Sequence, residues 1–492
     1  MVIINVALLL LAEVNNITMM MMTTNSRRIA LISSLLTGGG AIISSSAFQI
    51  HFLPTAIKTP PRRHQQYPID VSENAPRDTI TLTDWAVNYG IQLSDAFQLT
   101  SSSSAAAQEG NDDDDVYTIT NQNIPPETPI LSIPTDLILT GSKARQELGS
   151  DETLYGAEQS LSLSDHQAFY LFLKVLKEYE QSTDYYQSSS SPWYYWLNSL
   201  PRYYSNGASM TDFCFGCLPP YAAGLALAEK TRYKQFVAAL DTISFLSFDT
   251  KSNEDLTKWA YNVVFTRSMD LPGGDCGLVP MVDYLNHGAE PNVYITYDDE
   301  GNCYVYSTRE VMAGEPLVFS YGDSTNPSNL MARYGFLDES SPATFCKYVI
   351  DNPTLEMFHL GYPNSMLFYN DGSISNEVWD VLLYELLLKV SLPDEQQQFY
   401  QAHMTGDDDD EGTTIKASYH EQYFAQTFQS IQSHVNYILN ELDELGMGLE
   451  TQIAQGQDAT RHPRLPLIMR HNEFVKCTFD NVQQNLDNMF AS

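Results

Sequence analysis

The amino-acid sequence predicts an α+β fold in which small β-sheets are combined with a helical insert and an all-helical C-terminal domain. Three observations lead to this class. Alternating apolar and polar residues, broken by Pro and Gly, predict strands at residues 116–140 and again at 277–322. Between these stretches, at about 160–265, apolar side chains recur at helical spacing. Beyond residue 351 the helical spacing returns and continues toward the end of the chain.

Length and charge limit the classes of function. The 492 residues suffice for two or three domains whose cores need no disulfide or metal to hold them. The 61 Asp and Glu residues outnumber the 26 Lys and Arg residues, which gives a formal net charge of −35 at pH 7. This charge repels phosphate backbones, so we expect no nucleic-acid partner. It favours encounter with a basic protein surface, and acidity that serves only solubility explains it equally well.

The six cysteines follow no disulfide-framework spacing. Cys214 and Cys217 have the C-x-x-C spacing that zinc sites and redox motifs share. No second pair and no nearby His completes a set of four ligands. We therefore expect a structural role for this pair and predict no metal site.

The first 78 residues predict a targeting region. Residues 1–47 combine the basic pair Arg27-Arg28, an apolar stretch and the small-residue run SSSA, which is the layout of a signal-type segment. Residues 48–78 form a transit-peptide-like linker, basic and Pro-rich, with no acidic residue before Asp70. The SSSAFQ junction resembles the Ala-Phe cleavage site of bipartite presequences in algae with secondary plastids. We expect a location in the plastid (chloroplast) stroma and no membrane association of the mature protein; the alternative is the secretory pathway.

The folded part begins, by this interpretation, at residue 79. TITLTDWAVNYGI (79–91) predicts a short opening helix, and the acidic low-complexity stretch SSSSAAAQEGNDDDD (101–115) a surface loop. VYTITNQNIPPETPILSIPTDLILT (116–140) predicts two short strands joined by a turn. The helical insert at about 160–265 then contains several amphipathic segments, of which NEDLTKWAYNVVFTRSM (253–269) is the last.

Strands return after the insert. NVYITYDDEGNCYVYSTREV (292–311) is the clearest hairpin, AGEPLVFSYG (313–322) adds a strand, and NPSNLMARYGF (326–336) predicts a short helix. In the C-terminal part, Ser418 and Glu421 form a capping box that predicts the start of a long amphipathic helix.

With these elements placed, the segment NHGAEPN (286–292), the hairpin and GEPLVFSYG (314–322) together resemble the signature of SET-domain protein methyltransferases. In that family an Asn-His-x-x-x-Pro-Asn segment and a Gly-Glu-x-x-x-x-x-Tyr segment cross in a pseudoknot beside the cofactor. WAYNVVFTR (259–267), the helical insert and the helical C-terminal third narrow the resemblance. They are similar to the RuBisCO large subunit lysine methyltransferase-like branch, which also includes an actin histidine methyltransferase. The resemblance implies a SET domain at 79–350 and a helical substrate-binding-like domain at 351–492.

The resemblance also implies roles for single residues. Asn286 and His287 match residues that contact S-adenosyl-L-methionine, the His chiefly through its backbone; the alternative for His287 is a buried, hydrogen-bonded histidine. Tyr321 matches the catalytic tyrosine beside the cofactor. Its hydroxyl is expected to orient the nucleophile and to accept weak C–H···O contacts from the methyl group. The alternative for Tyr321 is a core tyrosine that ends a strand.

Three more residues complete the predicted site. Arg267 matches an arginine near the cofactor carboxylate, a group that a guanidinium binds well. An ordinary ion pair of Arg267 with Asp283 or Asp270 is an equal alternative. The resemblance places Asp283 and Tyr334 at the substrate, with Tyr334 in the wall of the substrate channel.

The implied activity is that of an S-adenosylmethionine-dependent protein-lysine N-methyltransferase, a monomer acting on a non-histone protein with a target lysine and needing no metal. The acceptor lysine has to be neutral although its free pKa is about 10.4, and a desolvated aromatic channel favours the neutral form. One motif departs from the family: only Gly110 stands where a Gly-x-Gly segment is expected. A catalytically impaired SET-fold protein-binding module therefore remains an alternative, as does a protein-histidine methyltransferase.

Overall fold

The structure is a computed structural model of the whole chain. It describes residues 68–101, 116–149, 152–183, 191–345, 348–405 and 410–491. The targeting segment 1–47 lies outside the described residues, and so do most of the linker and the stretch 102–115 that contains Gly110.

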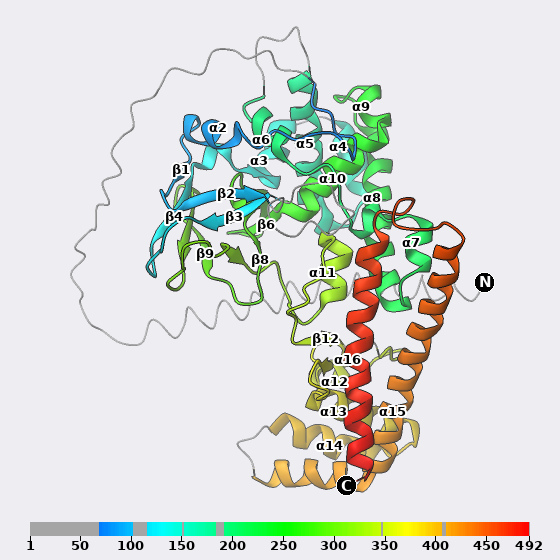
Figure 1. Cartoon of the computed structure of the whole chain (residues 1–492). Helices are drawn as coiled ribbons and strands as arrows, with labels where there is room; N and C mark the ends of the chain where they lie inside the picture. The colour runs from blue at the N-terminus through cyan, green and yellow to red at the C-terminus, as the bar shows by residue number, and fades with distance from the viewer. Residues whose placement is uncertain are drawn as a thin grey trace, which may run out of the picture.

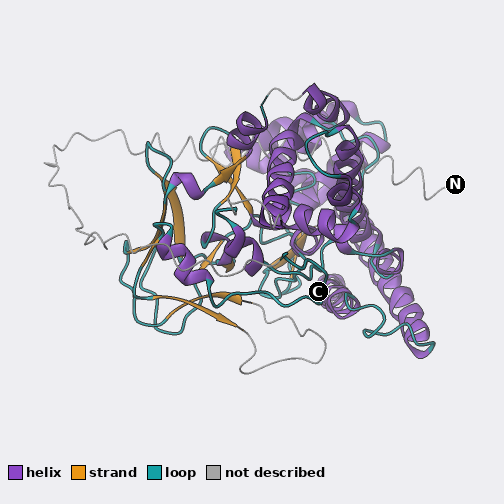
Figure 2. Cartoon of the chain, turned by 90° about the horizontal axis from the view of Figure 1, so that it is seen from above, coloured by secondary structure: helices purple, strands orange, loops and turns teal. Residues whose placement is uncertain are grey.

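Most strands of the described residues form small sheets on one side of the molecule, and most helices gather on the other side (Figure 2). The largest sheet has four antiparallel strands in the order β1 (Gln92–Leu93), β4 (Pro129–Ile133), β10 (Cys303–Ser307) and β9 (Val293–Tyr297). Three further antiparallel sets are β2 (Phe97–Ser101) with β3 (Val116–Thr120); β5 (Leu139–Thr140), β7 (Asp275–Leu278) and β6 (Ser268–Leu271); and β12 (Ala343–Phe345) with β13 (Leu367–Tyr369). The last pair, β8 (Asn286–His287) and β11 (Val318–Phe319), is parallel.

The predicted hairpin is confirmed. β9 and β10 pair in antiparallel register, with Cys303 opposite Tyr297 and Ser307 opposite Val293. Along β10 alternate residues are buried, as the sequence pattern requires. The two strands predicted within 116–140 also form, but they belong to different sheets, because β3 pairs with β2 whereas β4 pairs with β1 and β10.

The helices before β6 form a second layer beside the sheets (Figure 1). They are α2 (Leu82–Asn88), α3 (Gly141–Leu148), α4 (Glu152–Ser160), α5 (His166–Thr183), α6 (Tyr194–Ser199), α7 (Asp212–Gly216), α8 (Pro220–Ala239), α9 (Phe248–Ser252) and α10 (Glu254–Arg267). Phe236 of α8 packs edge-on against Phe169 of α5 and Tyr261 of α10, and all three side chains are buried. This core fixes α10, whose last residue is Arg267.

The folded part begins earlier than the sequence indicated. Ile69 and Val71 are buried in the main hydrophobic core, with exposed fractions of 2% and 6%. The backbone N–H of Asp78 donates to the carbonyl of Asn198, near the end of α6. The C-terminal end of the stretch that we assigned to the linker 48–78 is therefore folded, because its apolar side chains complete the core beside α2.

The remaining helices are α11 (Pro327–Tyr334), α12 (Leu355–His359), α13 (Asn376–Lys389), α14 (Pro393–Thr405), α15 (Asp410–Ala454) and α16 (Leu465–Ala491). The two longest, α15 and α16, lie side by side, and the start of α16 reaches back to α7 and α11 (Figure 1). There, the His471 ring shares a hydrogen bond of 2.8 Å with the Ser328 hydroxyl of α11. None of the described helices is long and apolar enough to cross a membrane.

The predicted capping box at Ser418 is wrong. The described part of α15 already begins at Asp410, so Ser418 lies inside the helix, and its hydroxyl donates to the carbonyl of Ile415 over 2.7 Å. A Ser-x-x-Glu pattern inside a long helix imitates a start signal, since a serine hydroxyl also bonds well to a carbonyl of the preceding turn.

Cys214 and Cys217 are free thiols buried among apolar side chains next to the start of α8. Burial raises the pKa of Cys217 to about 11. A thiol that stays protonated at neutral pH is a poor nucleophile. The pair is thus placed as part of a hydrophobic core, as expected from its sequence context.

Candidate active site

The two sequence segments singled out above meet in a parallel crossing. Val318 lies opposite Asn286 and Phe319 opposite His287 in the β8–β11 pair. The Asn292 side chain completes the crossing, because its oxygen accepts from the backbone N–H of Val318 over 2.8 Å. Asn292 is fully buried, so this amide holds two distant segments together without competition from water.

The close approach of the two segments also explains one glycine. A Cβ atom added at Gly288 would lie 2.6 Å from a methyl group of Val318. The backbone N–H of Gly288 donates to the carbonyl of Phe319 over 3.1 Å, which continues the pairing past the end of β8. A larger residue at Gly288 would push β11 away from β8.

A cavity of ≈ 430 Å³ opens beside this crossing. The six residues predicted for the site all line it: Arg267, Asp283, Asn286, His287, Tyr321 and Tyr334. They come from α10, from the short turn before β8, from β8 itself, from the residues after β11 and from the end of α11. The fold thus brings the predicted residues together, while their roles toward a ligand stay predictions.

Tyr321 is held from both ends. Its backbone N–H donates to Nδ1 of His287 over 3.0 Å, and its hydroxyl donates to the carbonyl of Leu285 over 2.6 Å. Its ring lies among other aromatic rings, with centroid distances of 5.0 Å to Tyr334 and 6.1 Å to Phe336. The hydroxyl proton is therefore directed at the protein.

The His287 ring serves the backbone rather than the cavity. Because Nδ1 accepts from Tyr321, we assign the ring proton to Nε2. Burial lowers the pKa of His287, which favours this neutral form. Nε2 faces Oδ2 of Asp338 at 3.5 Å, too far for a good hydrogen bond, and neither atom has another partner among the described residues. His287 is thus a hydrogen-bonded positioning group and not a free base, which is the alternative that the sequence left open.

Arg267 forms the ion pair that was its alternative interpretation, with Asp283. Its Nη1 donates to the carbonyl of Asp283 over 2.6 Å and lies 3.3 Å from Oδ2 of the same residue. Arg267 nevertheless lines the cavity, and its Nε has no partner among the described residues. One guanidinium therefore both fixes Asp283 and keeps a donor for a ligand.

Burial disfavours both charges of this pair, but the outcome differs between the two residues. Burial raises the pKa of Asp283, and the Arg267 guanidinium only partly opposes the shift. Burial also disfavours the charge on Arg267, but the Asp283 carboxylate outweighs it and raises the pKa of Arg267. Since a guanidinium keeps its proton in proteins, we take the pair as ionised at neutral pH.

The second oxygen of Asp283 is the unusual feature of this pair. Oδ2 also accepts from the indole N–H of Trp196 over 3.1 Å, whereas Oδ1 is buried with no partner among the described residues. Two residues earlier, Met281 adopts a φ of 74°, a left-handed conformation that is rare for a residue with a side chain. Strained backbone of this kind gathers at functional sites.

Sequence reasoning missed part of the cavity wall. Tyr203 and Tyr204, in the loop after α6, line the cavity, and their hydroxyls are buried without a hydrogen-bond partner among the described residues. Burial raises the pKa of both hydroxyls, so both keep their protons as donors. The signal in the sequence is weak: two adjacent tyrosines directly before Ser-Asn-Gly, whose turn-forming residues place the pair in a loop. Phe336 and Trp196 were missed as well.

The unpartnered groups indicate what the cavity binds. Buried polar atoms in proteins almost always have a partner, so several orphans around one cavity point to the polar groups of a ligand. Here the donors are Nε of Arg267 and the Tyr203 and Tyr204 hydroxyls, and the acceptor is Oδ1 of Asp283. Such a set suits a molecule that carries an anionic group, a cationic group and a flat apolar part for the aromatic wall.

Comparisons with known proteins agree with this geometry. The family model described as "SET domain" matches residues 117–322. A SET and MYND domain-containing protein of Dictyostelium discoideum is 24% identical over 118 residues, which cover 23% of this chain and 32% of that protein. This chain therefore spans only 32% of that relative's length.

Two solved structures share the fold over most of the chain. The first is a crystal structure of the SET domain of LSMT bound to lysine and AdoHcy, with a TM-score of 0.51, 13% identity and coverage of 83% of this chain and 90% of that one. The second is Rubisco LSMT bound to sinefungin and monomethyllysine, with a TM-score of 0.51, 13% identity and coverage of 84% and 92%. The α+β fold prediction is confirmed: the chain contains a SET domain at residues 117–322, in the fold of the Rubisco LSMT structures.

Proposed function

We propose that this chain is an S-adenosyl-L-methionine-dependent protein-lysine N-methyltransferase that acts on a non-histone protein. The observation that carries the proposal is the β8–β11 crossing in a SET domain, which holds Tyr321 beside a cavity with unpaired buried polar groups. The solved structures with the same fold are described as bound to AdoHcy, sinefungin, lysine or monomethyllysine. Those ligands belong to those proteins, and they support the same ligand classes here.

The residues present suit S-adenosylmethionine. A cavity of ≈ 430 Å³ is within the range of small-molecule sites. Nε of Arg267 and the Tyr204 hydroxyl offer unpaired donors for a carboxylate, and Oδ1 of Asp283 offers an acceptor for an ammonium group. The Phe336 ring supplies a flat apolar surface in the same wall. Three of the four orphaned polar atoms thereby have a counterpart on this one molecule.

The bound cofactor would supply a methyl group activated by a sulfonium. The chain's part is to orient the acceptor amine and to keep it neutral. Tyr321 directs its hydroxyl proton to Leu285, so its oxygen can accept C–H···O contacts and align the amine. The lone pair of a neutral amine would accept the methyl group while the cofactor leaves as a neutral thioether, so the lysine has to lose its ammonium proton before the transfer. The rings of Tyr334 and Phe336 exclude water and so disfavour the ammonium form.

Two alternatives are decided by the same experiment. The full chain is titrated with S-adenosylmethionine in a calorimeter and incubated with labelled cofactor and a plastid-stroma extract. We expect saturable heat and label on a protein. No heat and no transfer would leave the SET-fold protein-binding module, which the missing Gly-x-Gly motif favours. If label is transferred, mass spectrometry of the labelled residue distinguishes lysine from histidine.

A pair of variants controls this test. Arg267→Ala removes the unpaired donor from the cavity and should abolish the binding heat. Arg470→Ala removes an arginine that forms an exposed ion pair with Glu339 on the surface of α16, and it should bind like the wild type. Equal binding by both variants would remove Arg267 from the cofactor site.

We also propose that the chain is addressed to the plastid stroma and acts there as a monomer, with residues 351–492 as a substrate-binding-like domain. The support for the address is the layout of residues 1–47 and the SSSAFQ junction. Terminal sequencing of the protein from a plastid fraction should find a mature start near Phe48. A full-length protein in another membrane would contradict this address.

A further inference from the structure

The loop after α6, residues 203–209, is the cavity wall that sequence reasoning missed, and we call it the wall loop. Its first two residues, Tyr203 and Tyr204, present buried hydroxyls at the cavity. The loop ends in a short 3-10 turn, Gly207–Ser209, that Asn206 caps. Tyr203 and Tyr204 lie outside any helix or strand, so the position of this wall depends on contacts from elsewhere. Those contacts come from distant parts of the chain.

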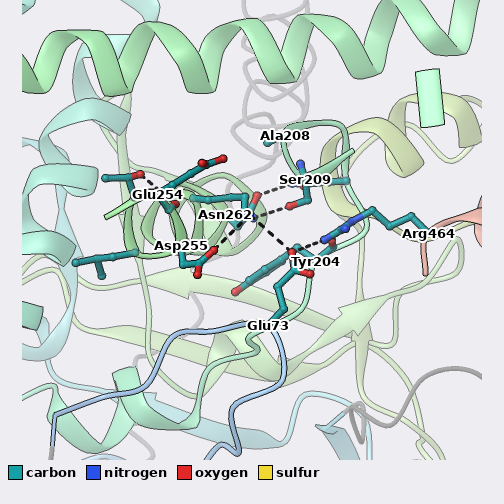
Figure 3. Close-up of polar contacts among 12 residues, drawn as sticks. Glu73, Tyr204, Ala208, Ser209, Glu254, Asp255, Asn262 and Arg464 are labelled. Atoms are coloured by element: carbon teal, nitrogen blue, oxygen red, sulfur yellow. Dashed lines mark hydrogen bonds and ion pairs between the residues drawn. The ribbon is translucent and has the colours of Figure 1, made fainter. Parts of the chain in front are cut away.

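The far end of the wall loop is fixed by α10 and α11. The Asn206 amide donates to Oδ1 of Asn262 and to the carbonyl of Arg333, each over 3.0 Å. The Asn262 amide in turn donates to the Ser209 hydroxyl over 2.9 Å (Figure 3). A Cβ atom added at Gly335 would lie 2.7 Å from the backbone nitrogen of Asn206, so α11 ends in direct contact with the loop.

The near end of the wall loop is fixed by one residue, Arg464, which lies in the connection between α15 and α16, directly before α16 begins. Nε of Arg464 donates to the carbonyl of Tyr204 over 2.9 Å, and Nη2 donates to Glu73 over 2.6 Å (Figure 3). The guanidinium carbon also lies 4.8 Å from the centre of the Tyr203 ring. The Arg464 side chain is only 8% exposed, so water competes little for these contacts.

Glu73, which bonds to Arg464, also contacts α10. Its Oε1 lies 3.9 Å from the ammonium group of Lys258, which belongs to the same helix that ends at Arg267. The carboxylate of Glu73 is thus between two cations, Arg464 from the connection before α16 and Lys258 from the helix that supplies the cavity donor. Arg464 therefore contacts both the first folded segment, at Glu73, and the wall loop. Glu73 in turn connects it to α10.

We propose that Arg464 is a positioning residue: it sets the affinity of the cavity for S-adenosylmethionine by holding the Tyr203–Tyr204 wall in place. The proposal rests on the proposed function of this cavity. Arg464 does not touch the reacting groups, and it acts through the backbone of Tyr204. Displacement of a ligand-contacting wall by about 1 Å is enough to weaken binding or catalysis many-fold.

A lysine at this position separates positioning from charge. Arg464→Lys keeps a positive charge for Glu73. The planar guanidinium of Arg464 bonds to Glu73 and to the Tyr204 carbonyl at the same time and also lies on the Tyr203 ring. A single ammonium group cannot make these three contacts together. If only the charge mattered, lysine would restore the wild-type behaviour. If position matters, lysine restores stability but not affinity.

The test uses the full chain, calorimetry with S-adenosylhomocysteine, and hydrogen–deuterium exchange of peptides that cover the wall loop. We expect Arg464→Ala and Arg464→Lys to bind about tenfold more weakly, with faster exchange in the wall loop. In a methyl-transfer assay KM for S-adenosylmethionine should rise about tenfold and kcat should stay within about threefold, because Tyr321 keeps its own contacts. Lys476→Ala, which breaks an exposed ion pair between α16 and Asp443 of α15, should behave like the wild type.

The outcomes separate this inference from the proposed function. A wild type that binds no S-adenosylhomocysteine would overturn the proposed function, and the inferred effect on affinity with it. A wild type that binds, together with an Arg464→Lys variant that binds equally well, would overturn the inference alone. Should Arg464→Ala fail to fold, Arg464→Lys decides the question, because it retains the pair with Glu73.

Discussion

Two buried aspartates, one in each half of the molecule, differ in how completely their side chains are hydrogen-bonded. Asp380 on α13 lies among the C-terminal helices with a side chain that is 3% exposed. It accepts from Lys416 over 2.6 Å and from His420 over 2.8 Å, and His403 lies 3.3 Å away. Asp283 beside the cavity has a side-chain exposure of 0%, but one of its oxygens has no partner among the described residues.

The pKa values of the two carboxyls move in opposite directions. Burial alone would raise both. At Asp380 the hydrogen bonds from His403, His420 and Lys416 outweigh burial and lower the pKa. At Asp283 burial prevails over Arg267 and the pKa rises. A buried charge that is fully bonded stabilises its own surroundings, whereas one left partly bonded beside a cavity keeps an acceptor for a ligand.

The largest expected effect is the loss of stability on removing Asp380, the carboxylate with hydrogen bonds to both oxygens. Asp380→Ala leaves Lys416 and two histidines around an empty position, so the free energy of unfolding should fall by about 3 kcal/mol. Urea unfolding followed by circular dichroism measures the loss. Asp443→Ala, which breaks an exposed pair with Lys476, should cost less than about 1 kcal/mol. Equal losses in the two variants would contradict the distinction between buried and exposed charges.

The next effect tests the cavity. Tyr321→Phe removes the hydroxyl that bonds to Leu285 and should lower methyl transfer about a hundredfold, which corresponds to about 2.7 kcal/mol. The melting temperature should change little, because the ring keeps its aromatic neighbours. The matched control is Tyr419→Phe, which removes a hydroxyl bonded to Gln398 in the C-terminal helices. An unchanged rate in Tyr321→Phe would exclude this hydroxyl from the mechanism.

A third prediction uses pH to sharpen the comparison. Because the pKa of Asp380 is lower in the folded state, its contribution to stability is complete above the unfolded carboxyl pKa of about 4 and is lost as pH falls below it. Asp283, whose pKa is raised, contributes with the opposite sign. Between pH 6 and pH 3 we expect Asp380 to account for a loss of about 1.4 kcal/mol. Unfolding curves of Asp380→Asn should show a weaker pH dependence than those of the wild type, and identical dependence would refute the assignment.

The smallest expected effect concerns the weak contact behind His287. Asp338 faces Nε2 of His287 at 3.5 Å, so it holds the ring only loosely. Asp338→Asn keeps an oxygen there and should lower methyl transfer about threefold, or about 0.7 kcal/mol. His287→Ala removes the acceptor for the Tyr321 N–H and should lower methyl transfer by more than Asp338→Asn does. A larger effect from Asp338→Asn than from His287→Ala would show that Asp338 acts directly on the ligand.

Much of this site could be predicted from sequence, because its residues lie in short motifs. Asn286, His287 and Tyr321 sit at fixed positions in segments that end at strands, and the crossing of these segments brings them together. The hairpin β9–β10 could be predicted for a related reason, since alternation and a turn are local properties. An ion pair of Arg267 with Asp283 or Asp270 was an equal alternative to cofactor binding, and the structure forms the pair with Asp283.

The wall loop and its support could not be predicted in the same way. Arg464 and the Tyr204 carbonyl are separated by 260 positions, and a backbone carbonyl carries no residue-specific signal. Trp196 likewise reaches Asp283 across 87 positions through one indole N–H. The start of α15 was misplaced for a local reason, because a Ser-x-x-Glu pattern inside a helix looks like one at its start. Tertiary contacts and not propensity decide these features.

The β8–β11 crossing has a consequence for how the protein is made. A nascent chain that ends at residue 317 contains all of β8 but not the strand that pairs with it, and Tyr321 and Tyr334 do not yet exist. Contacts between distant segments form slowly, since a long loop must first close. The site therefore assembles late, after most of the chain has left the ribosome, and a truncated product that ends before β11 contains half of the crossing and no site.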